Sequence, residues 1–188
     1  FHTNFRESFS GRVYRLFDLG HIIERRIVRD LRKAGFIVVK RQRTFKDFKG
    51  KFKGHWDGEV TGLLESSRPH VLEAKSANDK NFKEMKSKGI ESVSKYGAQI
   101  QVYMGYSGLD RAFCVVENKE TSERYQERVK FDKGRFDLLR EKARLIIEAK
   151  EPPRGISDNP AWWACKLCSL NDEKWCRREW RKESNVPF

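Results

Sequence analysis

The sequence predicts an α/β fold of the α+β kind, in which helices flank a mixed central β-sheet. Helical and strand patterns alternate along the chain: one helix, a group of strands, two helices, a second pair of strands and a final helix. Hydrophobic residues make up 38% of the 188 residues, enough for a substantial core. We expect a core domain over residues 1–150, followed by a linker and a small Cys/Trp-rich module over residues 151–188, packed on the core.

The elements follow from their local patterns. Apolar residues recur at helical spacing in the first segment, and Gly35 follows it as a helix stop. A basic, glycine-containing hairpin leads into a further strand pair. The predicted helices cover residues 13–34, 80–88, 93–106 and 136–149. The predicted strands cover residues 36–40, 43–54 (as a hairpin), 55–64, 70–77, 111–119 and 124–132.

The chain is strongly basic, with 40 Lys and Arg against 27 Asp and Glu and a formal charge of +13. Such an excess is typical of proteins that bind nucleic acid, although a solvated basic surface is the simpler alternative. No apolar run approaches the length of a membrane span, and no secretory signal opens the sequence. The candidate DNA-binding residues are Arg41, Arg43, Lys46, Lys49, Lys51 and Lys53. Charge alone does not separate DNA from RNA.

Charged residues interrupt the predicted strand 70–77. Glu73 and Lys75 share one face because side chains alternate along a strand. Alone, the pair is equally typical of an exposed strand. Asp57 favours a site, because a turn between the two strands would bring it beside Glu73 at one end of the sheet. Two carboxylates suit a hard divalent cation such as Mg²⁺, and a lysine beside them can activate water.

Three further polar residues lie on faces of the predicted helices. Glu24 shares a helical stripe with apolar residues, where a carboxylate is costly unless it is paired or binds a metal. A salt bridge to a nearby arginine is the alternative. Gln99 and Tyr103 are one helical turn apart and share a face. Their alternative is a partly buried amphipathic helix with the tyrosine in the core.

Four motifs follow one another along the chain: GHIIE (20–24), HWDG (55–58), EAK (73–75) and QIQVY (99–103). In this order they resemble the PD-(D/E)XK nuclease superfamily, and within it the bacteriophage exonucleases of the RecB-like or Cas4-like group. Trp56 stands where the family name has proline, a tolerant position. The resemblance covers nearly the whole chain and implies a restriction-endonuclease-like core. It also implies a metal-dependent deoxyribonuclease that hydrolyses phosphodiester bonds. The favoured form is a DNA exonuclease of phage recombination or DNA processing.

The resemblance also implies roles for the site residues. Asp57, Glu73 and the backbone carbonyl of Ala74 would bind Mg²⁺ or Mn²⁺, and Lys75 would position the attacking water. Glu24 would hold a metal-bound water or a second metal.

On the predicted helix 93–106, Gln99 would orient the Lys75 region or the DNA, and Tyr103 would line the site.

Two alternatives stay open: a restriction-type or structure-specific endonuclease, and a non-catalytic DNA-binding module of the same fold. The second is disfavoured because Asp57, Glu73 and Lys75 are all present. DNA, as a linear duplex or single strand, is the expected partner. A single-strand annealing protein is a further candidate partner, and both a monomer and an oligomer stay open. A phage-encoded protein would act in the bacterial cytoplasm.

The hairpin phenylalanines are expected either to stack on bases or to pack beneath the hairpin: Phe45, Phe48 and Phe52.

The C-terminal cysteines form a CxxC pair with a third cysteine close behind: Cys165, Cys168 and Cys176. This spacing favours a structural metal, with three reduced, unliganded cysteines as the alternative. The resemblance implies a [4Fe-4S] cluster that also uses a distant N-terminal cysteine. No cysteine precedes Cys114, which lies in an apolar run and is expected in the core. The fourth ligand would then lie upstream of Phe1, or a histidine such as His2 or His21 would complete a zinc site.

Overall fold

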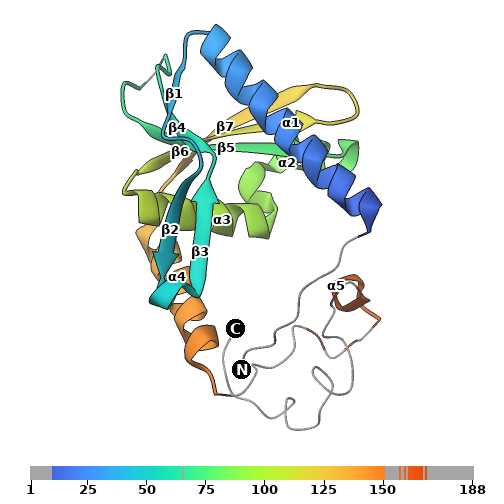
Figure 1. Ribbon diagram of the computed structural model, residues 1–188, viewed down its shortest axis with the longest axis vertical. Coiled ribbons are helices and arrows are strands. Elements are labelled where there is room, and N and C mark those ends of the chain that lie inside the picture. Colours follow the sequence, from blue (N-terminus) through green and yellow to red (C-terminus); the bar gives the residue numbers. More distant parts are fainter. Residues whose placement is uncertain are drawn as a thin grey trace. The chain divides into compact units, whose positions relative to one another are not determined.

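The computed structural model describes residues 10–64, 66–150, 157, 159, 161–166 and 168 (Figure 1). Ser10–Arg140 forms one compact unit, and Phe1–Phe9 with Glu141–Phe188 forms a second. The boundary between them falls within α4 (Lys133–Glu148). The second unit also contains the short helix α5 (Trp163–Lys166). The predicted domain boundary at residue 150 stays a prediction.

The core of the first unit is a five-stranded mixed sheet in the order β1-β4-β5-β6-β7. Only the central pair, β5 with β6, is parallel, and the other neighbours are antiparallel. The strands are β1 (Ile37–Val39), β4 (Gly58–Thr61), β5 (His70–Ala77), β6 (Arg111–Asn118) and β7 (Arg124–Lys130). This confirms the mixed sheet that the sequence predicts.

Helices cover the sheet on both faces, and each face has its own apolar cluster. On one face α1 (Gly11–Lys33) packs Ile23 and Ile27 against Leu72 of β5. On the other face, α2 (Asp79–Lys88) and α3 (Ser94–Ser107) pack with residues such as Val71. Leu72 and Val71 point to opposite faces because strand side chains alternate. Burial of these two clusters holds the sheet between its helices.

The helix limits follow from their end residues. The side chain of Asn78 accepts a hydrogen bond from the backbone N–H of Asn81 at 2.9 Å and so caps the start of α2. Gly89 ends α2 at φ 83°, as the sequence predicts. Two short 3₁₀ turns, Phe48–Gly50 and Ile90–Ser92, complete the elements. No helix in the described part of the chain is long and apolar enough to cross a membrane.

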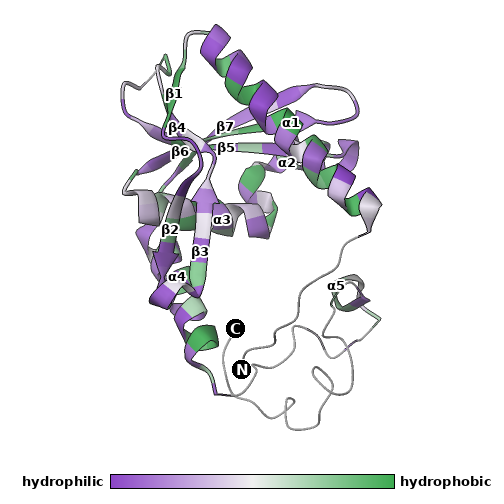
Figure 2. Ribbon diagram, viewed as in Figure 1, coloured by the Kyte–Doolittle hydropathy of each residue, from purple (hydrophilic) through white to green (hydrophobic). Residues whose placement is uncertain are grey.

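A separate two-stranded sheet, β2 (Arg43–Asp47) with β3 (Phe52–Trp56), forms the predicted basic hairpin. Hydrophilic residues predominate in β2, in contrast to β1 (Figure 2). Phe45 is 8% exposed and stacks on Tyr106 of α3 with ring centroids 4.1 Å apart. Phe52 packs edge-on against the rings of Phe45 and Tyr106. For these two phenylalanines the structure therefore favours packing beneath the hairpin over stacking on bases.

Candidate active site

Asp57 and Glu73 lie side by side because of the register between β4 and β5. Gly58, the first residue of β4, is paired with Leu72 in an antiparallel register. Asp57, which precedes Gly58, therefore lies next to Glu73, which follows Leu72. Asp57 Oδ2 accepts a hydrogen bond from the backbone N–H of Ala74 at 2.8 Å. The turn that the sequence predicts between these strands therefore brings the two carboxylates to one place.

Glu73 is buried, with 2% of its surface exposed. Oε1 lies 2.5 Å from Nζ of Lys75, whereas Oε2 is buried and has no hydrogen-bond partner in the described structure. Burial raises the pKa of Glu73 to about 7, Lys75 opposes this shift, and the nearby charge of Asp57 adds to it. Burial, together with the charge of Glu24, also raises the pKa of Asp57.

Lys75 continues into a hydrogen-bonded chain toward α3. Its Nζ donates to Gln99 Oε1 at 2.9 Å, and Gln99 Nε2 donates to the hydroxyl of Tyr103 at 2.6 Å. Burial lowers the pKa of Lys75, but the carboxylates of Glu73 and Asp57 outweigh it, so the net shift is upward. Lys75 is therefore held as an ammonium group. The predicted residues on β5 and α3 form one connected network.

Glu24 reaches the same region from α1 and is held by two side chains. Arg41 Nη2 lies 2.5 Å and Gln42 Nε2 2.9 Å from Glu24 Oε1. His21 Nδ1 lies 3.9 Å from Oε2. The salt bridge with an arginine, the alternative reading of Glu24, is thus present. Glu24 is nevertheless close enough that its charge raises the pKa of both Asp57 and Glu73.

The sequence reasoning missed several neighbours of the site. Gln42 binds Glu24 from an exposed position that carries no motif. Tyr96 places its ring 5.1 Å from Nζ of Lys75. His55 belongs to the HWDG motif but was given no role of its own, and its effect on the pKa of Asp57 opposes the larger upward effect of burial.

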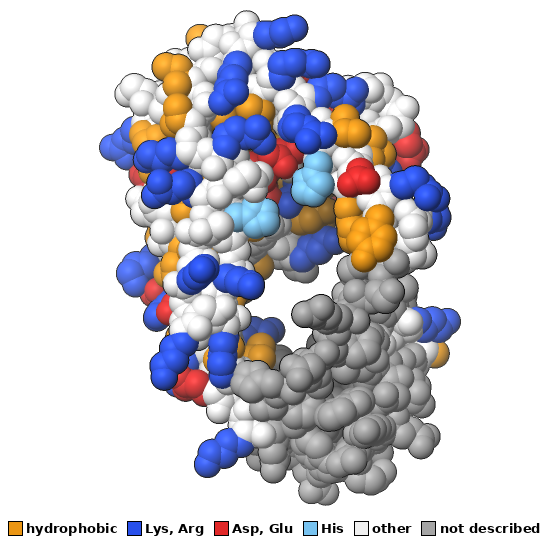
Figure 3. Space-filling model, viewed as in Figure 1, with side chains coloured by type: hydrophobic (Ala, Val, Ile, Leu, Met, Phe, Trp, Pro, Cys, Tyr) orange, Lys and Arg blue, Asp and Glu red, His pale blue; other side chains and the backbone are white. Residues whose placement is uncertain are grey.

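The basic residues of the hairpin remain at the surface. Figure 3 shows Lys and Arg side chains around acidic and histidine side chains on one face of the Ser10–Arg140 unit. Lys46 and Lys53 are directly paired across the hairpin, on the face opposite Phe45. The exposed members of the predicted DNA-binding set are Arg43, Lys46, Lys49, Lys51 and Lys53. Arg41 is half-buried and forms an ion pair with Glu24 instead.

The carboxylates of Asp57 and Glu73 decide whether this site can hold a metal ion. Among the described residues, no group of three or more His, Cys, Asp or Glu side chains converges to hold a metal. Within the described contacts, however, Glu73 Oε2 is a buried carboxylate oxygen without a partner, a costly state that a cation would relieve. Asp57 lies beside it and is bound through only one oxygen in the described contacts. Oxygen donors of this kind suit Mg²⁺ or Mn²⁺.

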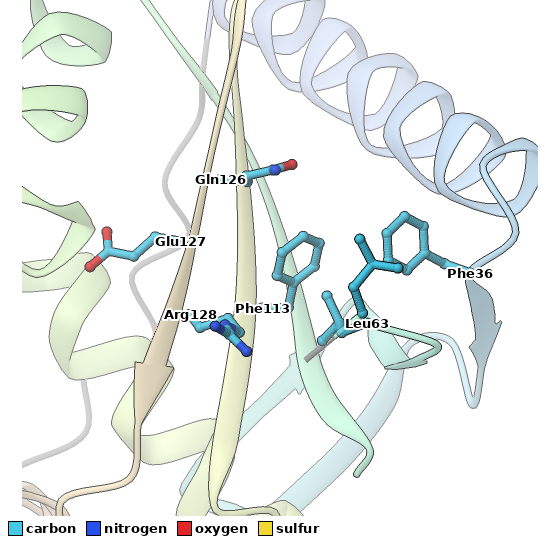
Figure 4. A pocket seen from close by; sticks show the side chains of 7 residues that line it. Phe36, Leu63, Phe113, Gln126, Glu127 and Arg128 are labelled. Carbon is cyan, nitrogen blue, oxygen red and sulfur yellow. The ribbon is translucent and has the colours of Figure 1, made fainter. Parts of the chain in front are cut away.

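A separate pocket lies on the α1 face of the sheet (Figure 4). It has a volume of about 300 Å³. Phe36, Leu63 and Phe113 point toward one another in it, whereas Glu127 points away from them. Its lining residues are Phe36, Leu63, Leu64, Phe113, Gln126, Glu127 and Arg128. None of the candidate catalytic residues lines this pocket.

The cysteine predictions are only partly within the described structure. Cys114 is buried in the core, as predicted. Cys165 is buried and Cys168 is exposed, and both are free thiols. Cys176 lies outside the described residues. The structural metal at the C-terminal cysteines therefore stays a prediction. Of the two histidines suggested as fourth ligands, His2 is also outside the described residues, and His21 lies beside Glu24.

Comparisons with known proteins bear on the fold. No family model and no curated protein matches the sequence. The structure is similar to an alkaline exonuclease (LHK-Exo) from Laribacter hongkongensis, with a TM-score of 0.57 and 16% identity over 75% of this chain and 69% of that chain. LHK-Exo in complex with dAMP gives a TM-score of 0.58 and 18% identity over 76% and 69%. The chain therefore has the restriction-endonuclease-like fold, a mixed sheet between helices, that its sequence predicts.

Proposed function

We propose that this protein is a metal-dependent deoxyribonuclease. The observation that carries the proposal is the buried Glu73 carboxylate, which has Lys75 on one oxygen, no partner on the other, and Asp57 as its neighbour. A buried carboxylate held in this way is costly for stability alone. Perturbed groups of this kind cluster at functional sites. The fold similarity to an alkaline exonuclease supports the same reading.

The proposed roles follow from the contacts of each group. A bound Mg²⁺ or Mn²⁺ would supply Lewis-acid stabilisation of the phosphate and activation of water. Asp57, Glu73 and the carbonyl of Ala74 would hold it. The Lys75 ammonium would orient the attacking water and stabilise the negative charge that develops on phosphate. Its position is held by Gln99, which is itself bonded to Tyr103.

The hairpin is the proposed path of the DNA backbone. Lys46 and Lys53 stand directly opposite each other, and like charges in this arrangement destabilise a sheet. A phosphate between them would remove that repulsion. The phenylalanines on the other face are buried in part against α3, so the exposed face offers cations and not aromatic rings. We infer that the hairpin contacts the backbone without reading base sequence.

Exonuclease activity is the favoured form of the proposal, because the solved relative is named as an exonuclease and one of its structures holds dAMP. A phage context, a role in recombination, a single-strand annealing partner and an oligomer stay predictions of the sequence resemblance. The same holds for the Cas4-like grouping, for a cytoplasmic location and for a [4Fe-4S] cluster or Zn²⁺.

The test is digestion of end-labelled linear duplex beside closed circular DNA, with Mg²⁺, Mn²⁺ or EDTA. We expect metal-dependent loss of the linear form alone, and cutting of the circle would indicate an endonuclease. Glu73→Ala should abolish cleavage and retain DNA binding. Glu117→Gln is the matched control, because Glu117 is a buried carboxylate on β6 whose two oxygens are paired with Arg26 and Arg124. Cleavage by folded, purified Glu73→Ala protein would contradict the proposal.

A further inference from the structure

The short turn between β1 and β2 has an unusual backbone. Lys40 has φ 45° and Gln42 has φ 53°, both in the left-handed region that side-chain-bearing residues rarely adopt. Neither is glycine or asparagine, the residue types that enter this region at least cost. Strained conformations of this kind persist where surrounding contacts enforce them, and they gather at functional sites. Contacts from outside the turn must therefore stabilise these two left-handed conformations.

The turn contacts two of the three acidic residues of the candidate site. Arg41 and Gln42 both donate to Oε1 of Glu24, at 2.5 and 2.9 Å. The backbone N–H of Gln42 also donates to the carbonyl of Asp57 at 3.4 Å. Glu24 lies 17 and 18 residues before these two donors in the chain. The turn thus ties α1 to the residue that precedes β4.

Close packing fixes the turn against β4. A Cβ atom at Gly58 would lie 3.2 Å from the carbonyl oxygen of Val39 and 3.6 Å from Cγ of Arg41. The absence of a side chain at Gly58 therefore lets this segment approach the strand that begins next to Asp57. Gly58 therefore admits the protein's own backbone at this point.

Glu24 needs such a restraint because of its charge and its length. Its carboxylate shares the site with those of Asp57 and Glu73, and like charges favour rotamers that move it away. A glutamate on a helix surface also has several accessible rotamers. Two donors on one oxygen select a single position, and the arginine offsets the negative charge. The second oxygen, Oε2, is bonded to neither of these two donors.

We propose that Arg41 and Gln42 are positioning residues, which hold the Glu24 carboxylate in the acidic site at the expense of backbone strain in their own turn. The inference rests on the proposed metal-dependent function and deepens it. It gives Arg41 a role different from that of the exposed hairpin cations. Residues that orient ligands of a metal site in this way typically contribute roughly 10- to 100-fold to metal affinity or activity.

The central variant is Gln42→Gly, which removes the amide and relieves the left-handed φ at once. Ser122→Gly is the matched control: Ser122 has φ 64° in the exposed turn between β6 and β7, and its relief of strain touches no site residue. We expect both variants to melt at or above the wild-type temperature. Only Gln42→Gly should bind Mn²⁺ more weakly, by roughly tenfold. Mn²⁺ affinity is measured by electron paramagnetic resonance, without DNA.

A double-mutant cycle separates positioning from a general structural role. In a Glu24→Gln background, Gln42→Gly should have no further effect on Mn²⁺ affinity, because its target is already removed. An equal loss in both backgrounds, or no loss in either, would overturn the inference. A parallel fall in melting temperature and Mn²⁺ affinity for Gln42→Gly would overturn it too. If the wild-type protein binds Mn²⁺ but cleaves no DNA, the proposed function fails, and the cycle still decides the role of the turn.

Discussion

Nζ of Lys75 lies 2.5 Å from Oε1 of Glu73, and the other oxygen of that carboxylate is buried without a partner in the described structure. The two residues are separated by one position on β5 and therefore share a face. An ion pair that served stability alone would have both oxygens satisfied. The pair fits the proposed metal site, in which a cation would bind the second oxygen of Glu73.

The first prediction concerns Lys75. Lys75→Met should lower the cleavage rate roughly 100- to 10,000-fold, because it removes the ammonium that, in the proposed function, would face the reacting phosphate. DNA affinity should change little. Single-turnover cleavage and a binding titration measure the two quantities. Lys95→Met is the control, since Lys95 lies 5.0 Å from the same Tyr96 ring but is exposed. Equal losses in both variants would contradict the assigned role.

The second prediction concerns stability against pH in the metal-free protein. The pKa of Glu73 is about 7 in the folded state against an ordinary value of 4.5. The folded state therefore binds this proton more tightly, and the associated stability is present below pH 4.5 and lost as pH rises through 7. Relative to Glu73→Gln, the wild-type protein should lose about 2–3 kcal/mol between pH 5 and pH 8.

Urea unfolding of both proteins at each pH, with EDTA present, measures this difference. The ion pair with Lys75 forms only when Glu73 is ionised, so its contribution is already contained in the pKa of about 7 and is part of the measured difference. Saturating Mg²⁺ should stabilise the wild-type protein at pH 8 and leave Glu73→Gln largely unaffected. If the difference in unfolding free energy between wild type and Glu73→Gln is the same at pH 5 and pH 8, Glu73 is already ionised at pH 5.

The third prediction concerns the hairpin. Changing Lys46 and Lys53 together to glutamine should weaken DNA binding and reduce the slope of log affinity against log salt by about 1.8 for duplex DNA, if each lysine neutralises one phosphate. Lys130→Gln is the control, because Lys130 is an exposed lysine at the end of β7, paired with Arg111 at the start of β6. An unchanged slope in the double variant would place the DNA elsewhere.

The fourth prediction concerns Gly20, which opens the GHIIE motif, and Gly54, which precedes HWDG. A Cβ atom at Gly54 would lie 2.7 Å from the ring of Phe45, so Gly54→Ala should destabilise the protein by about 1–3 kcal/mol. At Gly20, in α1, a Cβ atom meets nothing within 4 Å, and Gly20→Ala should stabilise the helix by about 0.5–1 kcal/mol. Thermal unfolding of the two variants gives opposite shifts if the packing beneath the hairpin is as described.

Local patterns predicted most of the fold. The predicted helix over 13–34 is observed as Gly11–Lys33, and the predicted strand over 70–77 is observed as β5. These elements could be predicted because burial on one face imposes a period of 3.6 or 2 on the sequence. The shared face of Glu73 and Lys75 follows from the same alternation. The burial of Cys114 follows from the continuous apolar run in which it lies, since β6 is buried on both faces.

The hairpin phenylalanines could not be placed from their pattern. Phe45, Phe48 and Phe52 alternate with lysines, and this pattern fits a packed face or a base-stacking face equally well. The contact of Phe45 with Tyr106 joins segments that are far apart in the chain. Such a contact depends on how the hairpin docks on α3, which no local period encodes.

The sequence by itself therefore determined the order of the elements, the faces of the strands and the residue types of the candidate site. The tertiary structure decided which of these residues meet. The β4–β5 register places Asp57 beside Glu73. The side chains of Arg41 and Gln42, in the turn before β2, donate hydrogen bonds to Glu24 of α1. The physical reason is that register and docking arise from long-range packing and pairing, whereas periodicity reports only on the burial of each segment.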